Sequence, residues 1–187
     1  MASELKGKKI AILATDGFEQ SELMEPRRAL DKAGAETVVI APKAGKIKGW
    51  KMKEWGETVN VDKTLDQADV HDYDALVLPG GVMNPDHLRM DRKAVDFVGQ
   101  FVNSGKPVAA ICHGPWTLME TGALRGKTVT SWPSLKTDLK NAGANWVDQE
   151  VAQDGQFVTS RKPEDIPAFN RAIIELVSGS AHHTRAA

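Results

Sequence analysis

The chain has 187 residues, of which 41% are hydrophobic and 26% are charged. This length predicts a single domain over residues 1–187, large enough to fold without disulfides or a structural metal. The 24 basic and 25 acidic residues nearly cancel, so no specific nucleic-acid binding is expected, because nucleic-acid-binding proteins carry a basic excess or a clustered basic face.

Short apolar runs alternate with amphipathic stretches along the chain. The runs lack an alternation of polar and apolar residues, which is typical of strands buried on both faces of a parallel sheet. The predicted strands cover residues 9–14, 36–41, 75–79 and 107–112, and the predicted helices cover 23–33, 91–103, 117–121, 136–142 and 163–177. This order predicts an α/β sandwich with a mostly parallel central sheet and helices on both faces.

Three segments interrupt or end this pattern. Pro26 is expected to break or restart the first helix early. Residues 42–62, which contain several glycines, two tryptophans and a lysine-rich stretch, predict a hairpin or excursion whose lysines form a solvated loop rather than a phosphate-binding patch. Residues 178–187 predict a flexible tail in which His182 and His183 are solvated.

Chemically active residues follow the ends of three predicted strands. These segments are 15–19 (TDGFE), 79–81 (PGG) and 112–115 (CHGP). Open parallel sheets bind ligands outside the carboxyl ends of their strands, and those ends share one edge. We therefore expect the functional site where these three segments meet.

Cys112 stands where a buried strand is expected to turn sharply into a helix. A nucleophile at such an elbow is pushed out of the sheet on a strained backbone. The N–H groups of the following helix N-terminus would lower the thiol pKa and stabilise an oxyanion. A free cysteine is also often a plain core residue, but this setting favours the nucleophile.

The neighbours of Cys112 suggest roles that the residues alone leave open. His113 is adjacent in sequence, so it is not expected to act as the usual base, and it could instead bind substrate, shuttle a proton or be structural. Glu19 could share a proton with the cysteine or merely cap a helix. Gly80 and Gly81 could form the second wall of an oxyanion hole or only a turn.

These motifs resemble the ThiJ/PfpI family, and specifically its branch of PfpI intracellular proteases and general stress proteins. They occur in the family's order and span nearly the whole chain. The matching segments are 17–19 (GFE), 76–81 (LVLPGG), 105–115 (GKPVAAICHGP), 141–148 (NAGANWVD) and 159–161 (TSR) before Pro163.

The resemblance implies a flavodoxin-like sandwich, similar to class I glutamine amidotransferases, with a nucleophile elbow at Cys112. It implies that Glu19 hydrogen-bonds the thiol and that His113 is the family histidine. Members form dimers, and this branch also forms hexamers in which an acidic residue, here matched by Asp86, reaches the histidine of a neighbouring subunit. We therefore expect a homo-oligomer.

Two departures from the family pattern concern the same region. One extra residue separates Gly81 from Asp86, which could displace the carboxylate. Trp116 stands where relatives often have glutamine. Its indole could narrow the substrate pocket, or it could pack in the core of the elbow helix.

The activities that the resemblance implies all begin with thiolate attack on a carbonyl. They are cysteine peptidase, glutathione-independent glyoxalase and removal of glyoxal adducts (deglycase). A small, partly enclosed site suits reactive dicarbonyls better than a peptide, so we expect a cysteine-dependent stress-protection enzyme acting on small carbonyl compounds or on protein adducts. The alternatives are a PfpI-type peptidase and a non-enzymatic redox sensor or chaperone.

The sequence also argues against several kinds of site and classes of protein. No cofactor or metal is expected, because the five histidines lack ligand spacing and the single cysteine supplies no second thiolate. Amidotransferase chemistry is excluded, because no histidine lies between His113 and His182 and no acid follows His183 to complete a triad. No apolar run near the N-terminus suits a membrane span or an export signal, and a lone cysteine is typical of a reducing cytoplasm.

Overall fold

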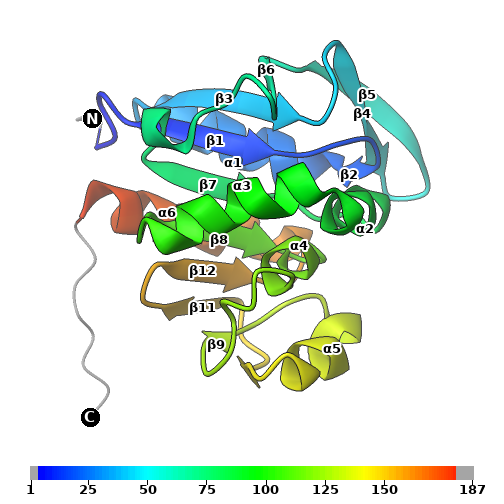
Figure 1. The fold of residues 1–187 in the computed structure, drawn as a ribbon, viewed down its shortest axis with the longest axis vertical. Coiled ribbons are helices and arrows are strands. Elements are labelled where there is room, and N and C mark those ends of the chain that lie inside the picture. The colour runs from blue at the N-terminus through cyan, green and yellow to red at the C-terminus, as the bar shows by residue number, and fades with distance from the viewer. Residues whose placement is uncertain (1–3, 180–187) are drawn as a thin grey trace.

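The computed structural model of the protein describes residues 4–179 (Figure 1). A seven-stranded sheet of order β11-β12-β8-β7-β1-β3-β6 forms its centre, and each neighbouring pair is parallel except β11 and β12. The strands are β1 (Lys9–Leu13), β3 (Glu36–Ala41), β6 (Lys63–Thr64), β7 (Ala75–Leu78), β8 (Val108–Ile111), β11 (Val151–Asp154) and β12 (Phe157–Ser160). The predicted buried strands are therefore confirmed.

Helices cover both faces of this sheet (Figure 1). On one face, α1 (Gln20–Lys32) and α6 (Ile166–Ser178) bury side chains such as Leu30 and Phe169 against Ile10 and Ile12. The opposite core includes Phe97 and Phe101. Its helices are α2 (Met83–Met90), α3 (Arg92–Asn103), α4 (Pro115–Met119) and α5 (Lys136–Asn141). This is the expected flavodoxin-like sandwich.

The expected break at Pro26 is wrong, because Pro26 lies inside a continuous α1. Proline removes one N–H from the helix ladder, but α1 is held by a buried stripe of Glu22, Leu23, Pro26 and Leu30. Burial of that stripe against the sheet outweighs the lost hydrogen bond.

The tail begins later than expected. Helix α6 continues to Ser178 and ends at Gly179, whose φ of 74° allows a left-handed cap. Residues 180–187, with His182 and His183, lie outside the described residues.

The predicted excursion is an antiparallel hairpin of β4 (Lys46–Lys51) and β5 (Glu54–Asn60). Strand β2 (Phe18–Glu19) joins β4 in parallel and so ties the segment after β1 to the hairpin. Figure 1 shows this small sheet at the carboxyl edge of the central strands. A further parallel pair, β9 (Thr128–Val129) with β10 (Asn145–Trp146), lies beyond β11.

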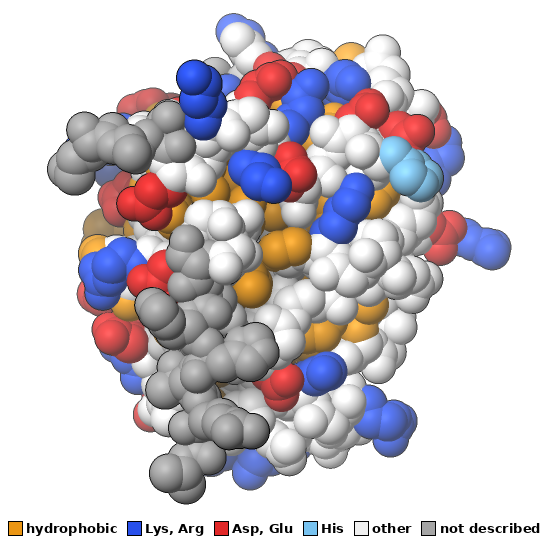
Figure 2. All heavy atoms as spheres, turned by 90° about the vertical axis from the view of Figure 1, so that its left-hand side faces the viewer, with side chains coloured by type: hydrophobic (Ala, Val, Ile, Leu, Met, Phe, Trp, Pro, Cys, Tyr) orange, Lys and Arg blue, Asp and Glu red, His pale blue; other side chains and the backbone are white. Residues whose placement is uncertain are grey.

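The molecule's surface at the amino ends of the strands carries charges of both signs. Figure 2 shows lysine and arginine side chains interspersed with aspartate and glutamate on this face. The mixture agrees with the balanced overall charge. Among residues 4–179, no helix combines the length and the apolar character needed to cross a bilayer.

Candidate active site

The elbow predicted at Cys112 is present in the structure. Cys112 follows β8 with a φ of 61°, in the left-handed region that residues other than glycine rarely adopt. Its N–H donates to the Ser160 carbonyl and its carbonyl accepts from the Trp132 N–H, each at 3.0 Å. These bonds to flanking segments hold the strained backbone in place, as a nucleophile elbow requires.

His113 faces the sulfur, which differs from the expectation for helix neighbours. Its Nδ1 lies 3.2 Å from Cys112 Sγ. The contact arises because Cys112 has a left-handed backbone, so the two side chains are not splayed as they would be on a helix. The imidazole stacks on Trp132, with ring centroids 6.1 Å apart. Burial lowers the pKa of His113 to about 4, so the ring is neutral at neutral pH.

The acid beside the thiol is Glu22, not Glu19 as expected. Its carboxyl is fully buried, and Oε1 accepts the Gly80 N–H at 3.1 Å. A Cβ placed on Gly80 would touch both Glu22 Oε1 and Cys112 Cβ, which shows how closely the two side chains converge. Burial raises the pKa of Glu22 to about 8, so the carboxyl is protonated at neutral pH and can donate to the sulfur.

The thiol itself is harder to ionise than its elbow position suggested. Burial and the charge of an ionised Glu22 raise the pKa of Cys112, whereas the N–H groups of Gly81 and His113 lower it. The expected lowering is therefore corrected, because burial dominates and α4 is only 5 residues long. The two acids titrate as a pair, and a thiolate is favoured only while Glu22 keeps its proton.

Glu19 has a different position. It ends β2, is half-buried, and its carboxyl accepts the backbone N–H of Met52 at the hairpin tip. Burial raises the pKa of Glu19, and the Met52 hydrogen bond opposes that shift. Glu19 therefore anchors the hairpin beside the thiol.

Glu22 was missed, although the sequence held a signal for it. It lies four residues before Pro26, which lies four before Leu30, so a helical pattern places it on the buried stripe of α1. A carboxylate on an apolar stripe is uncommon unless it has a partner or a function. The helix was expected to start at residue 23, so Glu22 was left outside the helical pattern.

The backbone N–H groups of the two glycines after β7 have different partners. The Gly80 N–H is occupied by Glu22, whereas the Gly81 N–H faces the Cys112 side chain. Gly81 has a φ of 79°, and its backbone lies against Gly17. The Gly81 and His113 N–H groups therefore converge on the sulfur, where they could hold a developing oxyanion.

A cavity of about 350 Å³ opens onto the sulfur. Trp132 and Glu164 belong to it and were not anticipated, because they follow strands far along the chain and reach the site only through the tertiary fold. The complete lining comprises Glu19, Glu22, Trp50, Met52, Gly81, Val82, Cys112, His113, Trp132, Pro163 and Glu164.

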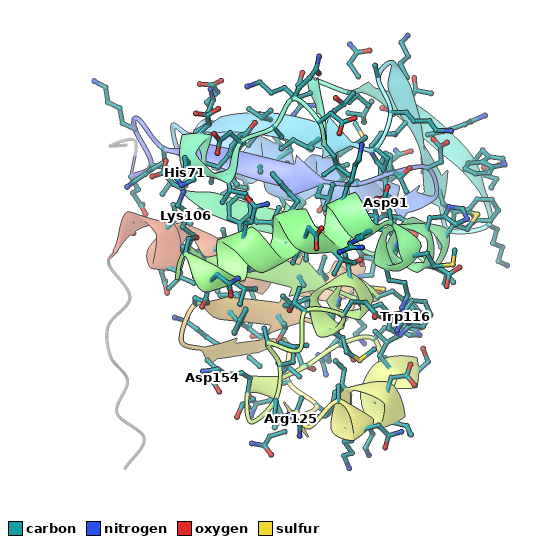
Figure 3. All side chains as sticks on the ribbon, viewed as in Figure 1. His71, Asp91, Lys106, Trp116, Arg125 and Asp154 are labelled. Carbon is teal, nitrogen blue, oxygen red and sulfur yellow. The ribbon has the colours of Figure 1, made fainter. Side chains whose placement is uncertain are left out.

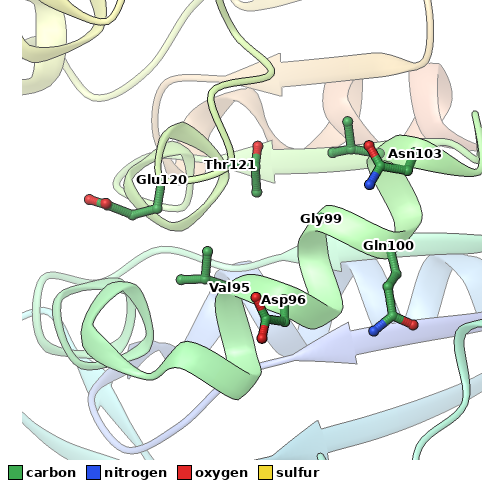
Figure 4. Close-up of a pocket in the computed structure, with 8 residues that line it drawn as sticks. Val95, Asp96, Gly99, Gln100, Asn103, Glu120 and Thr121 are labelled. Atoms are coloured by element: carbon green, nitrogen blue, oxygen red, sulfur yellow. The ribbon is translucent and has the colours of Figure 1, made fainter.

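A larger hollow of about 500 Å³ lies elsewhere, beside α3 and the residues after α4 (Figure 4). Its side chains include Asp96, Gln100, Asn103, Glu120 and Thr121, with neither a cysteine nor a histidine. Within residues 4–179, no group of three or more histidine, cysteine or acidic side chains is placed to hold a metal. Of these two cavities, only the one at Cys112 contains a thiol and an imidazole.

Comparison with known proteins agrees with this geometry. Residues 8–176 match the DJ-1/PfpI family. The chain belongs to the DJ-1/PfpI family. It is 48% identical over 172 residues to Protein/nucleic acid deglycase 2 of Escherichia coli (strain K12), covering 91% of this chain and 98% of that protein. It is 47% identical over 174 residues to General stress protein 18 of Bacillus subtilis (strain 168), again covering 91% and 98%.

Solved structures share the fold. DJ-1beta of Drosophila melanogaster has a TM-score of 0.83 at 28% identity, over 96% of this chain and 92% of that one. A two-domain protein of Anabaena variabilis, with a DJ-1/ThiJ/PfpI-like and a ferritin-like domain, has a TM-score of 0.86 at 37% identity, over 96% of this chain and 52% of that one. The DJ-1/PfpI membership and the cysteine-dependent enzyme class expected from the sequence are thus confirmed.

Two residues singled out in the sequence, Asp86 as a match to the family and Trp116 as a departure from it, lie outside the cavity. Asp86 is exposed on α2, and its role toward a neighbouring subunit stays a prediction. The Trp116 ring packs against His113 at 5.1 Å, and its Nε1 donates to Asp138 at 3.0 Å. Figure 3 shows Trp116 at the same end of the molecule as the site, where it buttresses His113 and does not narrow the cavity.

Proposed function

We propose that this DJ-1/PfpI protein protects cells by converting reactive dicarbonyls and their early adducts through covalent attack by Cys112. The observation that carries the proposal is the meeting, in one small cavity, of an elbow thiol, a buried Glu22 that keeps its proton and a neutral His113. The names of the relatives, a deglycase and a general stress protein, support it. We place the reaction in the reducing cytoplasm, where a lone cysteine stays reduced.

The first step joins the sulfur to the aldehyde carbon of methylglyoxal. The C–S bond forms, the carbonyl π pair moves to oxygen, and the thiol proton ends on that oxygen, which gives a hemithioacetal. The Gly81 and His113 N–H groups face the sulfur and can hold the transient oxyanion. Glu22 can relay this proton, because it can give its own proton to the oxygen and take the thiol proton in exchange, so that it ends the step protonated.

The second step moves hydrogen between carbons. Glu22 gives its proton to the second carbonyl oxygen and, as a carboxylate, removes the proton from the carbon bonded to sulfur, which leaves an enediol. Glu22 then gives that proton to the neighbouring carbon, while the first hydroxyl loses its proton to the carboxylate, directly or through His113. The product is a lactoyl thioester on Cys112, which water hydrolyses to lactate and free thiol. A protein-borne aminocarbinol enters the same route when the sulfur displaces its amine.

The test is lactate formation from methylglyoxal without glutathione, by the wild type and by Cys112→Ser, with the reduced thiol verified by mass. We expect lactate from the wild type alone. Equal lactate from both proteins, or none from verified reduced enzyme, would refute the proposal.

A second candidate, a peptidase, is favoured by one observation. A neighbouring hollow of about 420 Å³ shares Glu19, Met52, Pro163 and Glu164 with the thiol cavity, so the two form a continuous groove that a peptide could occupy. Cleavage of unfolded protein on gels that is abolished by Cys112→Ser would support this activity.

We further propose that the working unit is a homo-oligomer in which Asp86, exposed on α2, reaches the site of a neighbouring subunit. Sedimentation of the wild type and Asp86→Asn, together with lactate formation, tests it. We expect both proteins to form the same oligomer and only Asp86→Asn to lose activity. A monomeric wild type with full activity would contradict it.

A further inference from the structure

Two carboxylates line the cavity at Cys112 without a basic side chain to balance them. Glu19 and Glu164 both belong to the lining, and no lysine or arginine does. Within the described part of the chain, neither carboxylate takes part in an ion pair. The lining of the cavity therefore carries negative charge that no basic side chain of the same lining balances.

The neighbouring hollow, which shares Glu19 and Glu164, is lined by Arg28 and Lys51 but also by Glu25 and Glu57, so its acids still outnumber its bases.

Two other cations close in sequence to these acids are committed elsewhere. Arg161, three residues before Glu164, forms ion pairs of 2.9 Å with Asp165 and 2.8 Å with Asp148. The Lys48 ammonium lies 5.5 Å from the centre of the Trp55 ring. Neither is placed to neutralise the cavity.

The Glu19 carboxyl and the backbone of Glu164 are restrained before any ligand binds. The Met52 N–H holds the Glu19 carboxyl. Glu164 lies in the short helical turn η3 (Pro163–Asp165), where Pro163 restricts the backbone. An acceptor that is already held, as the Glu19 carboxyl is, loses little freedom on binding a ligand.

Aromatic walls complete a surface suited to cations. Trp50 and Trp132 line the same cavity as Glu19 and Glu164. The face of an indole attracts an ammonium or guanidinium ion, and a carboxylate accepts paired hydrogen bonds from a guanidinium. Carboxylates and indoles together therefore favour a positively charged group over a neutral or anionic one.

We propose that Glu19 and Glu164 form a cation-selecting subsite beside Cys112, so that the enzyme prefers carbonyl adducts carried on guanidinium or ammonium groups. The choice of adducts rests on the proposed function. The selection of charge at the sulfur does not, because it follows from the cavity alone.

The decisive experiment uses three thiol reagents of similar size and different charge. They are the 2-aminoethyl, methyl and 2-sulfonatoethyl methanethiosulfonates, which are cationic, neutral and anionic. In each case the sulfur attacks the reagent's sulfenyl sulfur and methanesulfinate leaves. Because Cys112 is the single cysteine, intact mass follows its modification directly, and N-acetylcysteine amide supplies the reference rates.

We expect the cation-to-anion rate ratio of the wild type to exceed that of the reference thiol by about tenfold at low salt. Glu164→Gln and Glu19→Gln should each lower the ratio about threefold, and about 0.5 M salt should lower it further. The matched control is Glu150→Gln, an exposed acid outside the cavity, which should leave the ratio unchanged. Taking ratios cancels differences in thiol ionisation among the variants.

A wild-type ratio equal to that of the reference thiol overturns the proposal, and so does a wild-type ratio that both glutamine variants retain. Glu164 is exposed, so its variant keeps the test valid even if Glu19→Gln perturbs the hairpin. The lactate assay fails or succeeds independently of these rates, which separates this proposal from the proposed function. If lactate forms, turnover of methylglyoxal adducts of N-acetylarginine amide should exceed turnover of N-acetylcysteine amide adducts, and Glu164→Gln should remove the difference by raising KM.

Discussion

His113 Nδ1 lies 3.2 Å from Cys112 Sγ, although the two residues are adjacent in the chain. The contact depends on the φ of 61° at Cys112, which turns both side chains toward one cavity. The strained residue thus has two consequences, since it exposes the sulfur and brings a histidine to it. Because burial keeps that histidine neutral, the arrangement does not supply the imidazolium that activates many catalytic cysteines.

Gly80→Ala should damage both the fold and the site. Its Cβ would lie 2.5 Å from Glu22 Oε1 and 2.8 Å from Cys112 Cβ, so buried groups must shift. We expect a loss of about 2 kcal/mol or more in the free energy of unfolding and a large loss of Cys112 reactivity. Urea denaturation and alkylation rates measure these effects.

The matched control is Gly99→Ala in α3, where a Cβ meets no atom within 4 Å. Alanine should stabilise that helix by about 0.5–1 kcal/mol. Equal stability of the two variants would contradict the close packing at Gly80.

Glu22 should control ionisation of the thiol through its proton. Glu22→Gln keeps a hydrogen-bond donor beside the sulfur, whereas Glu22→Leu removes it. We expect the rate of Cys112 alkylation by iodoacetamide at pH 7 to be about tenfold lower in the leucine variant than in the glutamine variant, since a lost donor raises the thiol pKa by about one unit. Identical pH profiles in both variants would show that Glu22 does not act on the sulfur.

Glu22 should also make stability fall as pH rises. Its pKa is about 8 in the folded protein, against an ordinary value of 4.5, so the folded state holds the proton more tightly and loses stability as pH rises toward 8. His113 acts in the opposite sense below its ordinary value of 6.5, because its folded pKa is about 4. The interval from pH 6.5 to 8 therefore isolates Glu22.

In that interval the wild type should lose about 2 kcal/mol of unfolding free energy relative to Glu22→Gln. Urea unfolding of both proteins at the two pH values gives the difference, in which all other titrating groups cancel. A constant difference would mean that Glu22 does not titrate in this range.

Trp132 should keep His113 neutral. Its indole stacks on the imidazole and is 39% exposed, so we expect it to shield His113 from solvent. In Trp132→Ala the pKa of His113 should rise from about 4 toward 6.5, as followed by NMR of the imidazole protons. Trp55→Ala is the control, because the Trp55 ring is 47% exposed on the hairpin and contacts Trp50 instead. A similar shift of the His113 pKa in both variants would contradict shielding of His113 by Trp132.

Local patterns in the sequence were enough to predict the central sheet and its reactive edge. The runs at β7 and β8 are apolar throughout, and those at β1 and β3 are apolar after their first one or two residues, as strands covered on both faces require. The position of Cys112 after β8 followed from the same pattern. The residues 42–62 were recognised as a hairpin because glycines and lysines break the alternation of strands and helices.

The choice between Glu19 and Glu22 was beyond those local patterns. The two carboxyls are one helical turn apart, and only the start and rotation of α1 determine which of them is buried against the sheet. Trp132 and Glu164 entered the cavity for a similar reason, since turns after β9 and β12 bring them there from distant parts of the chain.

The sequence by itself determined the central sheet and the position of the elbow with its single cysteine, because hydrophobic periodicity and strand-end position are local properties of the chain. The tertiary structure decided which acid lies buried beside the thiol, which histidine contact forms and which charges surround the cavity. Those properties depend on burial and on distances between segments far apart in sequence, and burial sets the pKa values on which the chemistry depends.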